Sequence, residues 1–115
     1  MYKDWSNTAA ELSTLMRDVH AEIPEVVKGF SAMARAATAD GALSPKVKEL
    51  MALAISISIR CDGCVAFHAR AAARHGASRQ EVIETIGMCM YMGGGPSFTY
   101  GSGALEAFDQ FADAD

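Results

Sequence analysis

The sequence predicts an all-helical protein of about six helices. Typical helix start signals recur along the chain, and glycine or proline follows most of the segments that they open. The one segment with strand-like alternation, residues 54–59, has no partner strand elsewhere in the sequence. These three observations favour helices throughout, and residues 54–59 are predicted to continue a helix.

Capping residues and prolines open the first three predicted helices. Ser6 or Asn7 can cap the first, which runs to about residue 20. Pro24 suits the first turn of the second, which ends near residue 38. Ser44-Pro45 opens the third, predicted over residues 46–60.

The second half of the chain has equally clear boundaries. The fourth helix is predicted to begin around Asp62 and to stop at Gly76, a residue type suited to a left-handed helix end. Ser78 and Glu81 form a capping box that opens the fifth helix, which runs to about residue 91. The glycines at 93–95 and Pro96 then break the chain, and a last helix covers about residues 99–111.

Length and composition exclude several classes of protein. A chain of 115 residues is expected to form one domain, residues 1–115, and 50% hydrophobic with 21% charged residues is typical of a globular protein. The net charge is −4 and no basic block occurs, so nucleic acid is not an expected partner. The longest apolar stretch, residues 50–59, is about half the length needed to cross a bilayer, so no membrane anchor is predicted. The N-terminus has no apolar signal core, which predicts a cytoplasmic protein.

Two cysteines and a histidine form the main candidate site. Cys61, Cys64 and His68 are spaced at three and four residues, so one helix face would carry two thiols and an imidazole. Cys61 lies at or just before the predicted helix start, where free N–H groups and the helix dipole favour thiolate. The imidazole can move protons as sulfur changes charge. Asp62 opposes thiolate formation, but the pattern as a whole predicts a redox-active dithiol.

Glu49 is the fourth candidate. It lies on a narrow polar line of an otherwise apolar helix, where a carboxylate is suited to accept protons. If the third and fourth helices form an antiparallel hairpin, Glu49 lies level with about Ala72, one turn past His68 and within its reach. Glu49 could instead be an ordinary ion-pair partner of Lys46 or Arg60.

These four residues have a known arrangement. Their spacing resembles the alkyl hydroperoxidase D motif: eleven residues separate Glu49 from Cys61, two separate Cys61 from Cys64, and three separate Cys64 from His68. The chain is similar to the carboxymuconolactone decarboxylase and alkyl hydroperoxidase D superfamily over about residues 43–108, preceded by N-terminal helices in residues 1–40. The resemblance implies an all-helical homo-trimer or homo-hexamer. It also implies an antioxidant peroxidase that acts on small hydroperoxides, binds no cofactor or metal, and is reduced by an external dithiol of the lipoyl or thioredoxin type.

The resemblance also implies a role for each residue. Cys64 would attack the peroxide, Cys61 would resolve the intermediate, and Glu49 with His68 would form a proton relay. The sequence departs from the family at Gly63, where the best-known member has a second histidine. The lactone-decarboxylating branch generally lacks the cysteine pair, so a lyase reaction is the weaker alternative.

Other interpretations of the sequence remain open. The dithiol could serve redox sensing or electron passing without efficient peroxidase activity. Zinc could bind the two thiols and the imidazole, although no fourth ligand is evident. Cys89 is predicted to be a small buried hydrophobe. The stretch 86–98 is rich in methionine, aromatic residues and glycine, and it is predicted to pack in a subunit interface or in the core.

Overall fold

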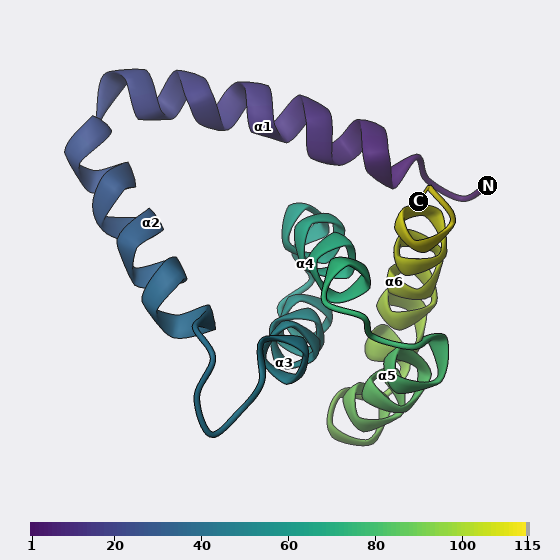
Figure 1. Ribbon diagram of the computed structural model, residues 1–115. Helices are drawn as coiled ribbons and strands as arrows, with labels where there is room; N and C mark the ends of the chain where they lie inside the picture. Colours follow the sequence, from purple (N-terminus) through teal and green to yellow (C-terminus); the bar gives the residue numbers. More distant parts are fainter. Residues whose placement is uncertain (115) are drawn as a thin grey trace.

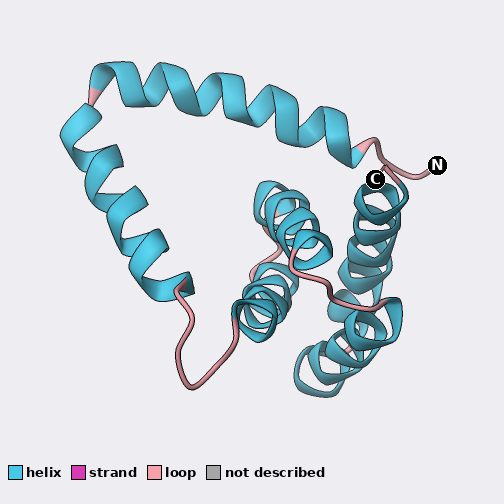
Figure 2. Ribbon diagram, in the orientation of Figure 1, coloured by secondary structure: helices cyan, strands magenta, loops and turns pink. Residues whose placement is uncertain are grey.

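The computed structural model describes residues 1–114, which form six α-helices and no strand. The helices are α1 (Trp5–Glu22), α2 (Pro24–Thr38), α3 (Pro45–Ser58), α4 (Asp62–Arg74), α5 (Arg79–Gly93) and α6 (Gly95–Asp113) (Figure 1). Loops are short except between α2 and α3 (Figure 2). The all-helical prediction is confirmed, and the strand-like residues 54–59 lie mostly within α3.

Four of the helices form the body of the molecule. α3 packs on α4, α5 packs on α6, and α4 joins the two pairs by packing on α6. α1 runs across one end of this bundle, where it contacts α4 and α6, and α2 turns back toward α3 (Figure 1). The first two helices therefore form a bent arm around the α3–α4 hairpin.

Small residues allow the central helices to approach closely. α4 buries Ala66, Ala69 and Ala72, and α6 buries Ala104 and Ala107. Alanine adds little bulk between helix axes and has the highest helix propensity. The close packing fixes α4, the helix that carries the cysteine pair, firmly in the bundle.

Three predicted boundaries are corrected by the structure. Asp4, rather than Ser6 or Asn7, caps α1, and its Oδ1 accepts the Asn7 N–H at 3.0 Å. α3 ends at Ser58 instead of 60, because the chain reverses through a left-handed residue there. α6 begins at Gly95 instead of 99, because the chain breaks at Gly94 (φ 70°) and Pro96 fits the first turn.

A large apolar surface lies outside the bundle core. All residues of α2 are described, and none of its side chains is buried. Large exposed apolar side chains occur on α2 (Val26, Phe30, Met33), on α3 (Val47, Met51, Ile55) and around the α5–α6 turn (Met88, Tyr91, Met92, Phe98). Within residues 1–114, no helix is long and apolar enough to cross a membrane. Exposed apolar surface of this extent is typical of protein interfaces.

Candidate redox site

The turn between α3 and α4 positions the first cysteine. Arg60 adopts φ 56°, and the Cys61 N–H donates to the Ser56 carbonyl at 3.1 Å. This bond satisfies a carbonyl at the end of α3, as in a Schellman motif, although arginine stands where glycine is usual. The chain therefore reverses within a few residues and places Cys61 directly before α4.

The two cysteines of the motif are bonded to each other. Cys61 is the N-cap of α4 in an extended conformation, and it forms a disulfide with Cys64 across a Cα–Cα distance of 5.2 Å. The Cys64 N–H also donates to the Cys61 Sγ at 3.2 Å. The predicted place of Cys61 at the helix start is confirmed. The same N–H would stabilise negative charge on Cys61 once the disulfide is reduced.

Glu49 and His68 meet across the α3–α4 hairpin. Glu49 Oε2 lies 2.8 Å from His68 Nδ1, and only 5% of the Glu49 surface is exposed. The contact follows from the antiparallel register that the sequence predicted. The alternative partner Lys46 instead pairs with Glu81 at 3.0 Å. The site thus contains a buried carboxylate hydrogen-bonded to an imidazole.

His68 shares a helix face with Cys64 and is partly exposed to solvent. It lies four residues after Cys64 on α4, so both are on one helix face. The His68 side chain is 35% exposed, whereas that of Glu49 is 7% exposed. An imidazole placed between a buried carboxylate and solvent is well suited to transfer protons.

A leucine occupies the space beside Gly63. A Cβ atom built on Gly63 would lie 2.7 Å from Leu12 Cδ1 of α1. The place where the family motif can carry a second histidine is therefore packed against the N-terminal arm. Such a histidine could enter only if α1 moved or Leu12 changed rotamer.

Asp62 has a partner that the sequence did not predict. Lys3 Nζ lies 2.6 Å from Asp62 Oδ2, and this ion pair is partly exposed. The hydrogen bond from Lys3 holds the pKa of Asp62 below its ordinary value. Lys3 lies in the irregular N-terminal segment, far from the motif in sequence, and no periodicity links the two residues.

The third cysteine is remote from this chemistry. Cys89 lies on α5 with 4% of its surface exposed, and its thiol donates to the Ala54 carbonyl at 3.6 Å. Burial raises the pKa of the Cys89 thiol, so the unreactive thiol form is favoured. The prediction of a buried hydrophobe is confirmed. Among residues 1–114, no three His, Cys, Asp or Glu side chains are grouped so that they could hold a metal ion.

The fold and the site define a class of protein: a helical protein with a cysteine pair at a helix start and a buried Glu–His pair beside it. The sequence profile of the carboxymuconolactone decarboxylase family matches residues 24–107. The chain belongs to the carboxymuconolactone decarboxylase family.

The chain is also similar to other proteins in sequence and in structure, one of which is described as a member of this family. An uncharacterized protein of Cupriavidus necator is 43% identical over 86 residues, which cover 75% of this chain and 76% of the relative. The crystal structure of an apo carboxymuconolactone decarboxylase family protein from Legionella pneumophila superposes with a TM-score of 0.92 at 44% identity, covering 94% of this chain and 96% of that chain. A structure from Thermotoga maritima has a TM-score of 0.73 at 26% identity, covering 84% of this chain and 91% of that chain.

Proposed function

We propose that the protein is a thiol-dependent peroxidase that reduces small hydroperoxides through its Cys61–Cys64 pair. The observation that carries the proposal is the disulfide at the start of α4, one turn from a histidine that bonds to a buried glutamate. A disulfide closing so short a loop adds little stability, so chemistry is the better reason for its presence. A dithiol that is reduced again after each turnover suits the cytoplasm, where thiols are kept reduced.

In the proposed reaction, Cys64 thiolate attacks the outer oxygen of the hydroperoxide. The O–O bond breaks, the sulfur becomes sulfenic acid, and the alkoxide leaves as an alcohol after it takes a proton. The Cys61 thiol then displaces water from the sulfenic acid and forms the disulfide. An external dithiol supplies two electrons and two protons, becomes a disulfide, and restores both thiols. His68 and Glu49 hold and deliver the protons at Cys64 and at the leaving oxygen.

Thiol counting tests the proposal directly. The reduced protein contains three cysteines, and one equivalent of an organic hydroperoxide should remove two titratable thiols. Dihydrolipoamide or reduced thioredoxin should restore both. If all three thiols persist after the hydroperoxide, or if the loss is not reversed by a dithiol, the peroxidase cycle is wrong.

A redox-sensing or electron-passing module is a second candidate, favoured by the packing of Leu12 over Gly63. Without the family histidine, the relay is shorter, and reaction with peroxide can be slow while the dithiol still exchanges with other thiols. Diamide would then oxidise Cys61 and Cys64 rapidly, whereas hydroperoxide turnover would be negligible. Comparing the two oxidants on the same sample separates the candidates.

We infer further that the chain assembles into a homo-trimer or homo-hexamer. The support is the exposed apolar surface, in which Phe30 is 62% and Ile55 is 58% exposed. Light scattering should give three or six times the chain mass of 12.2 kDa. Phe30→Glu and Ile55→Glu should each lower the measured mass, because a carboxylate is costly to bury in an apolar interface. Gln80→Glu, an equal charge change on α5, should not. A monomeric mass for the wild-type protein would contradict assembly.

A further inference from the structure

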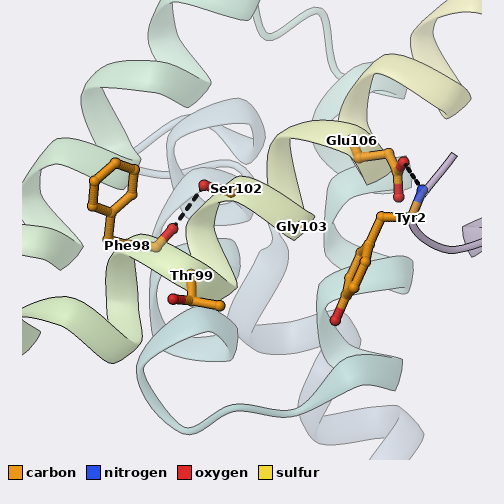
Figure 3. A pocket seen from close by; sticks show the side chains of 6 residues that line it. All are labelled: Tyr2, Phe98, Thr99, Ser102, Gly103 and Glu106. Carbon is orange, nitrogen blue, oxygen red and sulfur yellow. Dashed lines mark hydrogen bonds between the residues drawn. The ribbon is translucent and has the colours of Figure 1, made fainter.

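The residues before α1 are fixed on α6. Both carboxylate oxygens of Glu106 accept backbone N–H groups, from Tyr2 at 2.7 Å and from Lys3 at 2.9 Å, and Oε1 also accepts the Trp5 indole N–H at 2.9 Å. Figure 3 shows Tyr2 beside Glu106. Gln110 donates to the Lys3 carbonyl at 2.7 Å and accepts the Trp5 N–H at 2.9 Å. The N-terminal segment is therefore held at a defined position.

This anchoring directs the Lys3 side chain to Asp62. Lys3 Nζ lies 2.6 Å from Asp62 Oδ2 and 5.2 Å from the centroid of the Trp5 ring. The ion pair lines a hollow of about 60 Å³ together with Trp5 and Tyr100. Ion pairs as exposed as this one contribute little to stability. Stability therefore does not explain the ion pair, and its position next to the two cysteines suggests an effect on their chemistry.

Asp62 lies between the two sulfurs in sequence and is the first residue of α4. A carboxylate there opposes the thiolate that the helix start favours. Other ionisable groups near the dithiol include Tyr2 and Tyr100 close to Asp62, Arg60 directly before Cys61, and the Glu49–His68 pair. Lys3 is the basic side chain that contacts Asp62 directly.

We propose that Lys3 is a positioning residue that acts through Asp62: by neutralising this carboxylate, it increases the thiolate fraction of the dithiol and makes the disulfide easier to reduce. The inference rests on the proposed redox function. In the reduction step, the external dithiol donates two electrons and the S–S bond breaks. At a pH above the first thiol pKa, one sulfur takes a proton, the other remains a thiolate, and the second proton of the external dithiol goes to solvent. Lys3 stabilises this reduced state and has no comparable effect on the uncharged disulfide.

The test is a charge cycle made of Lys3→Met, Asp62→Asn and the double variant. Two quantities are measured without hydroperoxide: the lower apparent thiol pKa, from the rate of iodoacetamide alkylation against pH, and the equilibrium with glutathione. Lys3→Met should raise the lower thiol pKa by about half a unit to one unit, because the Asp62 carboxylate beside the thiols then has no compensating charge. It should also shift the glutathione equilibrium toward the disulfide by about threefold to tenfold. Asp62→Asn should move both quantities in the opposite direction.

The controls separate electrostatics from structure. Lys3→Arg keeps the charge and should behave like wild type, and so should Lys28→Met, a lysine paired with Glu25 on the remote α2. The effect of Lys3→Met should be much smaller in the Asp62→Asn background, because the Lys3 ammonium then lacks the carboxylate that holds it beside the dithiol. An unchanged thiol pKa in Lys3→Met, or an equal shift in both backgrounds, would overturn the proposal. If Lys3→Met does not fold, Lys3→Gln takes its place in the same cycle, with the same expected shift. These readouts do not depend on peroxidase turnover, so the peroxidase proposal can fail separately.

Discussion

Cys64→Ser should lose hydroperoxide turnover by about a thousandfold or more, because it removes the proposed attacking thiolate and leaves Cys61 without a partner for the disulfide. Serine keeps the shape of the residue, and its backbone N–H still reaches Cys61, so α4 should start as before. Peroxide consumption coupled to dithiol oxidation measures the loss. Turnover within tenfold of wild type would show that Cys64 is not the attacking residue.

Cys61→Ser gives the matched result for the resolving cysteine. It should still react once with hydroperoxide, because Cys64 and its helix position are retained, but the sulfenic acid cannot condense to a disulfide. Dimedone should therefore trap a stoichiometric adduct in Cys61→Ser and none in Cys64→Ser. Cys89→Ala, which removes a buried thiol on α5, should turn over like wild type. If the dimedone adduct instead forms in Cys64→Ser, Cys61 is the attacking cysteine and Cys64 the resolving one. The backbone N–H of residue 64, which donates to Cys61 Sγ and would stabilise a thiolate there, would explain that result.

Local sequence signals were sufficient for most of the fold. The capping box of Ser78 and Glu81 is present as predicted, and Pro24 opens α2. Gly76 adopts the left-handed conformation (φ 83°) expected just after α4. These features are short-range, so a few neighbouring residues determine them. Arg60 was not predicted as a left-handed residue, because arginine has no intrinsic preference for that conformation.

The parts of the site whose positions depend only on helix geometry were predictable from the sequence. Spacing places Cys64 and His68 on one face, and the register of a hairpin brings Glu49 to His68. The contacts made by the N-terminal part were not predictable. Leu12 reaches Gly63, and Lys3 reaches Asp62, only because α1 crosses the bundle. Local sequence patterns do not determine how one helix packs across others in the tertiary structure.

His68→Ala and Glu49→Gln should each lower hydroperoxide turnover by about a hundredfold to ten thousandfold, the usual contribution of general acid–base catalysis. Glutamine keeps the size of Glu49 and can still bond to His68, but it cannot hold the proton that the relay must store. The double variant should be little slower than the slower single variant, because both residues act in one relay. Single-turnover loss of thiols after mixing with hydroperoxide measures these rates, and Glu84→Gln, an exposed acid on α5, is the control.

Diamide provides the comparison that isolates the relay. Oxidation by diamide needs a thiolate but does not expel an alkoxide that must be protonated. His68→Ala and Glu49→Gln should therefore change the diamide rate much less than the hydroperoxide rate. An equal loss with both oxidants would instead indicate that the Glu49–His68 pair only supports the position of α4. Wild-type peroxide rates in Glu49→Gln would remove the buried carboxylate from the mechanism. The ratio of the two rates therefore tests whether the hydrogen bond across the hairpin serves proton transfer.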